Sequence, residues 1–367
     1  MAPPVPSPAG IAPGVSVIIC CFNSAARLPE TLRHLAAQQV RADLPWELLM
    51  VVDRATTDDT VKVIESFQPH FAPGQLRLVW EARRGLGAAR LTAAREARYE
   101  FLSFVDDDNW VPPDWVEIVH RTFTTLPQAT AFGGRGDAVY EREPPPAWFK
   151  DFCAAYAVGE QYRTAGEVTD QPTSLLWGAG LCIRRSAFLA LLDHGFEFIC
   201  SEKLGPELWA FVRSRPCEDT ELCFALRALG GRFFYVPELT YKHYMAADRL
   251  TWPVVRRMFR GHGRSGVFCH LLKMAADPQL PARQLARERS WRFQAARALW
   301  RLTRMLLRHP ASLLTNAEGS AVRLQADALR GQLEMLLRLR GRHDRIFDEQ
   351  RKRYLQPSAP VLSSAQP

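Results

Sequence analysis

The stretch FLSFVDDDN, residues 101–109, joins a short apolar run to three adjacent aspartates, Asp106, Asp107 and Asp108. The apolar run is typical of a buried strand, and the aspartates follow at its carboxyl end. Open α/β sheets bind ligands at this edge, and neighbouring carboxylates repel one another unless a cation or hydrogen-bond donors hold them. A polar turn that caps a following helix, with residues 112–114 at its N-terminus, explains the same residues. The stretch therefore predicts an α/β sheet and leaves open whether its acidic end is a ligand site or a turn.

The chain before this stretch alternates between predicted strands and predicted helices. Apolar, β-branched runs mark the strands, and helical spacing of apolar residues marks the helices. The strands are expected at residues 15–21, 46–53 and 76–80, and the helices at 28–35, 61–64 and 85–97. Strictly alternating β and α units imply a parallel, doubly wound sheet with helices on both faces.

The alternation breaks after the aspartates. Further strands are expected at residues 129–140, 177–184 and 232–236, and a helix is expected at 220–229, which ends at two glycines. Between the first two of these strands lies an irregular insertion at 141–171, a length that is typical of a functional loop.

The end of the chain predicts amphipathic helices. Arg297, Arg301, Arg304 and Arg308 fall on one side of a helix at about 100° per residue. The opposite side carries Trp291, Ala295, Ala298, Leu302, Met305 and Leu306. A second helix carries Leu329, Leu333, Leu336 and Leu337, and a basic cluster follows at residues 338–345.

These patterns divide the chain into four parts. We expect a flexible Pro/Ala-rich arm at residues 1–14, an α/β domain at 15–270, a basic helical region at 271–355 and a disordered tail at 356–367. The arm lacks the basic start and apolar core of a signal peptide, and no run of about eighteen uncharged apolar residues predicts a membrane span.

The charge of the chain is divided between two regions. Residues 249–353 carry 23 Arg and Lys against 8 Asp and Glu, a net +15, whereas the remainder is net −7. An acidic half suits a metal, and a basic end suits phosphate-bearing partners such as anionic lipid or nucleic acid. The eight cysteines form no C-x-x-C pair, which favours reduced thiols in a cytoplasmic protein over disulfides or structural zinc.

Acidic residues mark two further candidate positions. Asp53 closes the second predicted strand, where an acid is commonly a cap but also accepts hydrogen bonds from a base or a ribose. Glu218 and Asp219 begin the 220–229 helix, where they either cap it or provide a general base for a hydroxyl nucleophile. Taken alone, each of these residues is also explained by a structural role as a helix cap or turn residue.

Some of the candidate residues are of types that bind metal ions. Asp106 and Asp108, separated by one residue, allow one carboxylate to meet a hard divalent ion while its neighbour contacts a ribose, which implies a diphosphate ligand. His243 lies late in the chain, and its imidazole suits a transition metal, although a lone histidine is more often structural. No glycine-rich dinucleotide fingerprint, G-x-S-x-G elbow or H-E-x-x-H motif is present.

The order of these features resembles the inverting family 2 glycosyltransferases of GT-A fold. The resemblance spans about residues 15–266 and rests on six blocks: VSVIICCFNSAARLPETL, WELLMVVDRATTDDT, GLGAARLTAAREA, FVDDDNWVPPDW, CEDTELCFALRALGGRFFYVPEL and YKH. Two further blocks, WGAGLCIRRSAF and HYMAADRLTW, look most like bacterial exopolysaccharide enzymes, including the hormogonium-polysaccharide type. The chain departs from the family in Arg54, in Cys20 and Cys21, and in Leu91.

The resemblance implies a Rossmann-like, mostly parallel GT-A sheet and a role for each matched residue. Asp219 would be the catalytic base, tuned by Glu218, and Asp108 with His243 would hold Mg²⁺ or Mn²⁺. The nucleotide sugar would be bound by Asp53, Arg90, Asp106, Asp107, Trp177 and Gly178. Of these, the segment of Trp177 and Gly178 is expected to line the sugar pocket, unless it is simply a buried strand.

The implied function is metal-assisted, inverting transfer of a sugar from a nucleotide-diphosphate donor, with a UDP-sugar favoured. The acceptor would be a hydroxyl of a glycan or a lipid-linked sugar in bacterial polysaccharide synthesis. The alternative is a non-catalytic glycan-binding or scaffold protein that keeps the fold.

The expected location is the cytoplasm, with attachment to the inner face of the plasma membrane as an added possibility. The basic C-terminal helices would either pack on the catalytic domain with solvated arginines or bind an anionic membrane. Nucleic acid is a weaker candidate partner, because the arginines lack an interleaved aromatic platform.

Overall fold

The structure is a computed structural model that describes residues 11–171, 175–212, 217–310 and 318–355. Its strands are β1 (Ala12–Cys21), β2 (Trp46–Asp53), β3 (Leu76–Glu81), β4 (Tyr99–Phe104), β5 (Asn109–Trp110), β6 (Ala131–Tyr140), β7 (Gly166–Glu167), β8 (Cys182–Arg184) and β9 (Phe233–Met245). Its helices are α1 (Leu28–Ala36), α2 (Thr60–Phe67), α3 (Leu86–Glu96), α4 (Trp115–Thr125), α5 (Phe149–Phe152), α6 (Arg185–Asp193), α7 (Pro206–Val212), α8 (Glu218–Ala228), α9 (Trp252–Ala275), α10 (Ala282–Arg289), α11 (Trp291–Arg308), α13 (Ala321–Leu339) and α14 (Gly341–Leu355). Single 3₁₀ turns lie at Gln68–His70, Cys153–Tyr156 and Glu202–Leu204.

The strands form one mixed sheet that is mostly parallel, as predicted. The order is β3-β2-β1-β4-β8-β6-β9-β5, with β7 paired to β9. Strands β1, β2, β3, β4, β6 and β9 run in one direction, and the short strands β5, β7 and β8 run against them. All of the reversed strands come after β4, where the strict alternation of the sequence ends.

Strand β1 shows why helices cover both faces of the sheet. Its residues Val15, Val17 and Ile19 are fully buried against the side that carries α1, α2 and α4. Ile18 points the other way, into the core formed with α3, α6 and α8. Successive side chains of a strand alternate between faces, so an uninterrupted apolar run needs a cover on each side.

Two predicted strands differ from the structure. Only Cys182–Arg184 of residues 177–184 pairs in the sheet, because the N–H groups of Trp177 and Gly178 bond to Gln161 and Asp219 instead of to a neighbouring strand. Strand β9 is much longer than residues 232–236, so His243 lies inside a strand and not beyond it.

The two predicted ends of the chain lie mostly outside the described residues, namely residues 1–10 of the arm and the tail at 356–367. Strand β1 begins at Ala12, so residues 12–14 of the predicted arm belong to the sheet. Among the described residues, no helix has the length and apolar character needed to cross a membrane.

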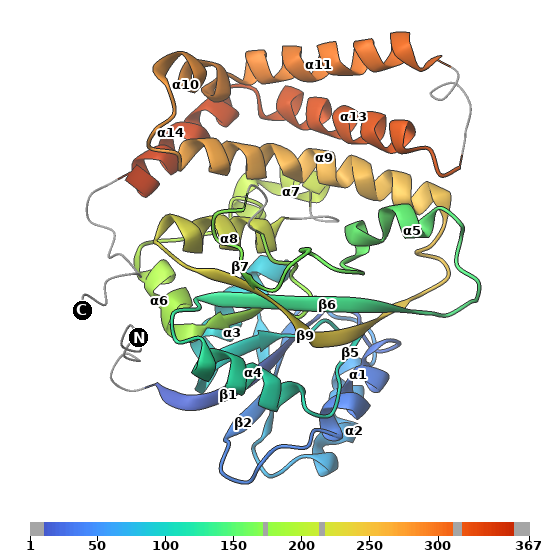
Figure 1. The fold of residues 1–367 in the computed structure, drawn as a ribbon, viewed down its shortest axis with the longest axis vertical. Helices are drawn as coiled ribbons and strands as arrows, with labels where there is room; N and C mark the ends of the chain where they lie inside the picture. Colours follow the sequence, from blue (N-terminus) through green and yellow to red (C-terminus); the bar gives the residue numbers. More distant parts are fainter. Residues whose placement is uncertain (1–10, 172–174, 213–216, 311–317, 356–367) are drawn as a thin grey trace.

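The C-terminal helices form a layer over the α/β domain (Figure 1). Helix α9 crosses the boundary predicted at residue 270, α13 packs against α9, and α11 lies on α13 as the outermost helix. Two glycines allow α9 and α13 to touch through their backbones. A Cβ at Gly263 would overlap the carbonyl oxygen of Ala328, and one at Gly331 would overlap that of Arg260. The basic helical region is therefore built onto the α/β domain.

This close contact gives a test of how the layer is held. Gly263→Ala is expected to lower the free energy of unfolding by about 1–3 kcal/mol, because the added methyl group forces two helix backbones apart. Gly266→Ala in the same helix is the matched control, since nothing lies within 4 Å of its added Cβ. The control should be neutral or stabilising by about 0.5–1 kcal/mol. Denaturant unfolding measures both, and equal losses would contradict the backbone contact.

Candidate active site

The carboxyl ends of β1, β2, β3 and β4 open into a cavity of about 770 Å³. The start of α8, the loop before β8 and the middle of α9 supply its other walls. The structure brings all ten predicted site residues to this cavity, although strands and helices far apart in the sequence carry them. They are Asp53, Arg90, Asp106, Asp107, Asp108, Trp177, Gly178, Glu218, Asp219 and His243.

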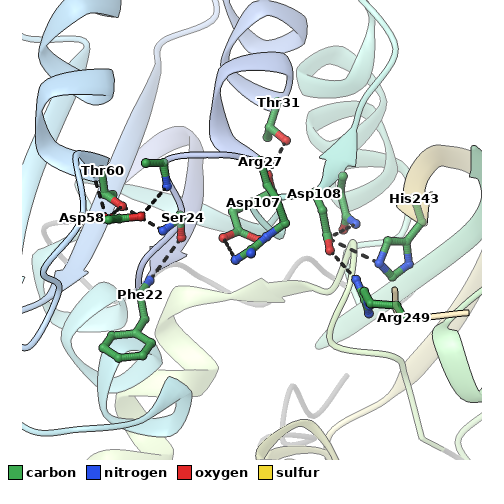
Figure 2. A network of polar contacts seen from close by, with 12 residues as sticks. Phe22, Ser24, Arg27, Thr31, Asp58, Thr60, Asp107, Asp108, His243 and Arg249 are labelled. Atoms are coloured by element: carbon green, nitrogen blue, oxygen red, sulfur yellow. Dashed lines mark hydrogen bonds and ion pairs between the residues drawn. The ribbon is translucent and has the colours of Figure 1, made fainter. Parts of the chain in front are cut away.

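The three aspartates after β4 have different surroundings. Asp107 accepts two hydrogen bonds from Arg27, at 3.1 Å from Nε and 2.6 Å from Nη2 (Figure 2). Its backbone carbonyl accepts a third from Thr31. Each carboxylate oxygen of Asp107 therefore has one hydrogen bond from Arg27 and can still accept another, and the nucleotide contact expected of Asp107 stays a prediction.

Asp108 meets His243 because of strand pairing. Strand β5 pairs with β9 so that Asn109 lies opposite His243, which places the preceding residue, Asp108, beside the imidazole. The Oδ1 atom of Asp108 lies 3.3 Å from His243 Nε2, and its Oδ2 atom accepts a 2.7 Å hydrogen bond from Arg249 Nη1 (Figure 2). Both Asp108 and His243 are buried.

The pKa values of the aspartates diverge for physical reasons. Burial, with the charge of Asp108, raises the pKa of Asp106 to about 6, and Arg90 and His243 only partly oppose this. Burial also disfavours the charged form of Asp108, but the hydrogen bond and charge of His243, with the charge of Arg249, outweigh it and lower the pKa of Asp108. Of Asp106 and Asp108, Asp108 is therefore the carboxylate whose surroundings favour the anionic form.

The surroundings of Asp108 and His243 fit a divalent cation. A carboxylate and an imidazole form an oxygen and nitrogen donor set that suits Mn²⁺ or Mg²⁺. The His243 Nδ1 atom is buried without a hydrogen-bond partner among the described residues, so the ring is oriented by its strand and by Asp108. Arg249 already places one positive charge on Asp108, which shows that this position accepts a cationic partner.

The acidic pair Glu218 and Asp219 opens helix α8 at the cavity wall. Asp219 Oδ2 accepts a 3.2 Å hydrogen bond from the N–H of Gly178, and its Oδ1 accepts one from Thr220 N. The side chain of Asp219 is thus fixed at the cavity by the helix start and by the loop before β8.

Glu218 faces a buried arginine. Its Oε1 atom lies 3.8 Å from Arg90 Nη1, and Arg90 is only 1% exposed. Burial, with the charge of Asp219, raises the pKa of Glu218 to about 7, and the charge of Arg90 opposes this rise. Glu218 therefore titrates near neutral pH next to Asp219.

Arg90 and Asp53, which are both expected to bind the nucleotide, have different surroundings in the cavity. Asp53 ends β2 on the cavity wall and accepts the N–H of Ala55. Arg90 packs on the ring of Phe104 and points towards Glu218, and a Cβ at Gly178 would lie 2.5 Å from its Nη2 atom. The glycine in the 177–180 segment thus allows the close approach of Arg90, which favours a role for Arg90 in holding Glu218.

Two arginines of this site were missed by sequence reasoning. Arg27 holds Asp107 across 80 positions of the chain, and Arg249 holds Asp108 across 141 positions. A lone arginine carries no spacing signal, so only the fold shows these pairs. Glu221, which is buried, accepts the N–H groups of Ile199 and Cys200 and thereby ties that segment to α8.

A mostly parallel sheet with a cavity at its carboxyl edge places this site where open α/β proteins bind their ligands. Comparison with known proteins gives the class. Residues 16–188 match the family model described as glycosyl transferase family 2. This match assigns residues 16–188 to a glycosyl transferase family 2 domain, and the rest of the chain lies outside the match.

Curated relatives and a solved structure agree with this assignment. The chain is 23% identical over 259 residues to the glucosyl-dolichyl phosphate glucuronosyltransferase of Haloferax volcanii, which covers 68% of this chain and 76% of the relative. It is 25% identical over 258 residues to the succinoglycan biosynthesis protein ExoM of Rhizobium meliloti, covering 68% and 74%. The mannosyltransferase PcManGT of Pyrobaculum calidifontis, solved with GDP-Man and Mn²⁺, superposes with a TM-score of 0.50 at 19% identity and 90% coverage of each chain. The fold is accordingly the predicted GT-A fold.

Proposed function

We propose that this protein transfers a sugar from a nucleotide-diphosphate donor to a hydroxyl group with inversion at the anomeric carbon. The observation that carries this proposal is that two separate clusters of side chains, each containing an aspartate, line the same cavity. Asp108 with His243 forms one group, and Asp219 with Glu218 forms the other. A leaving diphosphate needs a positive partner and an attacking hydroxyl needs a base, and the two groups suit these two needs.

The roles proposed for the residues are those that the resemblance to the family implies, and the surroundings of Asp108 and Asp219 support them. Asp219 takes the proton of the acceptor hydroxyl as its oxygen bonds to the anomeric carbon, and the bond between that carbon and the diphosphate oxygen breaks. Asp108 and His243 would hold Mg²⁺ or Mn²⁺, which as a Lewis acid stabilises the charge of the leaving diphosphate. Glu218 pairs with Arg90, and the charge of Glu218 tunes the strength of Asp219 as a base. Asp53, Arg90, Asp106 and Asp107 are assigned to the nucleotide, and Trp177 with Gly178 to the sugar.

The substrates and setting are proposed more broadly. A UDP-sugar is the favoured donor, and the acceptor is a glycan or lipid-linked sugar of bacterial exopolysaccharide synthesis. The name of the succinoglycan relative supports a polysaccharide product, and that of the dolichyl phosphate relative supports a lipid-linked acceptor. We place the reaction in the cytoplasm, at the inner face of the plasma membrane.

Thermal stabilisation by UDP, GDP and dTDP sugars in the presence of Mn²⁺ tests the donor assignment. One nucleotide class should raise the melting temperature of the full chain, and the rise should depend on Mn²⁺ because Asp108 and His243 would hold an ion that neutralises the diphosphate. Stabilisation by none of these donors would contradict the proposed function. Stabilisation by GDP or dTDP sugars alone would overturn only the choice of UDP.

The raised pKa of Glu218 predicts how transfer depends on pH. kcat/KM should rise with pH through about 7, because protonated Glu218 no longer neutralises Arg90, whose charge then weakens Asp219 as a base. Glu218→Gln should remove this rise and hold transfer at its low-pH level. Glu238→Gln, at an exposed position of β9, is the control and should keep the profile.

Stability gives a second readout of the same group. Between the ordinary glutamate pKa of 4.5 and about 7, the folded chain holds a proton on Glu218 that the unfolded chain has released. The free energy of unfolding should therefore fall as pH rises through this window, and Glu218→Gln should reduce that fall. An unchanged profile for transfer and stability in Glu218→Gln would contradict the shifted pKa.

A further inference from the structure

Helix α11 has two apolar faces, and the described part of the chain packs against only one of them. The covered face carries Ala295, Ala298 and Leu302, which are buried in the contact with α13. These residues belong to the side that the sequence predicts as apolar. Leu306 was predicted on that side, but it is 40% exposed.

The other apolar face points away from the protein. Phe293, Trp300 and Leu307 follow one another at intervals of seven residues and therefore form a stripe along the helix. Leu307 is 78% exposed and Trp300 is 59% exposed, and Leu299 and Leu306 extend the same face. A soluble protein rarely exposes so many large apolar side chains on one helix without a partner.

The charge beside this face is of a single sign. Helix α11 contains five arginines and no acidic residue. Arg301, Arg304 and Arg308 are exposed and border the apolar stripe along one edge, and Arg304 lies 5.2 Å from the ring centre of Trp300. An apolar stripe next to a row of arginines complements a surface that is apolar inside and negatively charged outside.

We propose that this outer face of α11, defined by Phe293, Leu299, Trp300, Leu306 and Leu307, docks on an anionic lipid bilayer. The apolar side chains enter the boundary between headgroups and acyl chains, and the arginines contact lipid phosphates. The inference rests on the proposed function only for the choice of the inner plasma membrane. Its chemistry depends on α11 alone.

The arrangement of the helical layer suits such docking. Helix α11 is the outermost element, α13 lies beneath it and α9 beneath α13 (Figure 1). Helix α9 lines the cavity with Ser265, Gly266 and Cys269. The docking face and the cavity therefore lie on opposite sides of the α9–α13 pair, and a docked enzyme keeps its cavity close to the membrane without inserting it.

Co-sedimentation of the full chain with vesicles tests this inference. The wild-type chain should bind vesicles of phosphatidylcholine mixed with phosphatidylglycerol. It should not bind vesicles made only of phosphatidylcholine. High salt should weaken the binding, because it screens the arginines. The double variant Trp300→Glu with Leu307→Glu should bind the anionic vesicles at least about tenfold more weakly, since two buried apolar contacts are lost.

The control replaces an exposed aromatic elsewhere. Trp80→Glu changes a residue that is 45% exposed on the edge strand β3, and it should bind vesicles like the wild type. Wild-type binding by the α11 double variant, or no binding of the wild-type chain to anionic vesicles at low salt, would overturn the inference. So would a dimer in solution, measured by light scattering, that the double variant converts to a monomer, because a second copy would then cover the face.

Transfer to a soluble acceptor separates this inference from the proposed function. The double variant should keep wild-type transfer in solution, because its substitutions lie far from the cavity. A wild-type chain that binds vesicles but transfers no sugar would contradict the proposed function and leave the docking face in place.

Discussion

Asp219→Asn is expected to lower the rate of sugar transfer by about 10²- to 10⁴-fold, the usual cost of losing a general base. The amide keeps an oxygen that can accept the N–H of Gly178 or of Thr220, so the start of α8 should retain its geometry. What is lost is the negative charge that takes the acceptor proton. The loss should therefore appear in kcat, with donor binding close to that of the wild type.

Two comparisons make this result specific. Asp43→Asn removes an exposed carboxylate that pairs only with Arg41 among the described contacts, and it should leave transfer unchanged. Mn²⁺-dependent thermal stabilisation by the donor checks that the Asp219→Asn cavity still binds. Near-normal transfer by Asp219→Asn would show that the base is another group, and Glu218 would then be the next candidate because it titrates near neutral pH.

The sequence predicted the sheet and the site where local patterns carry the information. The run at residues 15–21 alternates between two covered faces, and the aspartates stand at the end of a buried strand. Acids that end parallel strands meet at one edge of the sheet, which brings Asp53 and Asp106 together, whereas the other candidate residues came from the resemblance to the family. All ten residues indeed line one cavity.

Features that depend on distant partners were not predictable in this way. The segment at residues 177–181 is apolar enough for a strand, but its N–H groups bond to Gln161 and Asp219, which the sequence does not place nearby. The pairs of Arg27 with Asp107 and of Arg249 with Asp108 depend on the fold as well. Helical periodicity found the covered face of α11 but not its second apolar face, because only the packing shows which side meets α13.

Asp108→Asn is expected to abolish the Mn²⁺-dependent part of donor binding and to lower transfer by more than about 10²-fold. Loss of a charged ligand removes several kcal/mol of stabilisation from the leaving diphosphate, and about 1.4 kcal/mol corresponds to each factor of ten. Isothermal titration of Mn²⁺ into the chain, with and without UDP, measures the binding. Asp114→Asn, an exposed aspartate before α4, is the control and should bind Mn²⁺ like the wild type.

The variant Arg249→Ala distinguishes between two explanations for a loss of Mn²⁺ binding in Asp108→Asn. If Asp108 only anchors Arg249, both variants break the same ion pair and should bind Mn²⁺ alike. If Asp108 is a metal ligand, Arg249 competes with the cation for its Oδ2 atom, so Arg249→Ala should bind Mn²⁺ at least as tightly as the wild type while Asp108→Asn binds it weakly. His243→Ala should then resemble Asp108→Asn, because the imidazole meets the other carboxylate oxygen and receives nothing from Arg249. Opposite shifts in Mn²⁺ affinity on the two sides of one ion pair are a result that a purely structural role for Asp108 does not produce.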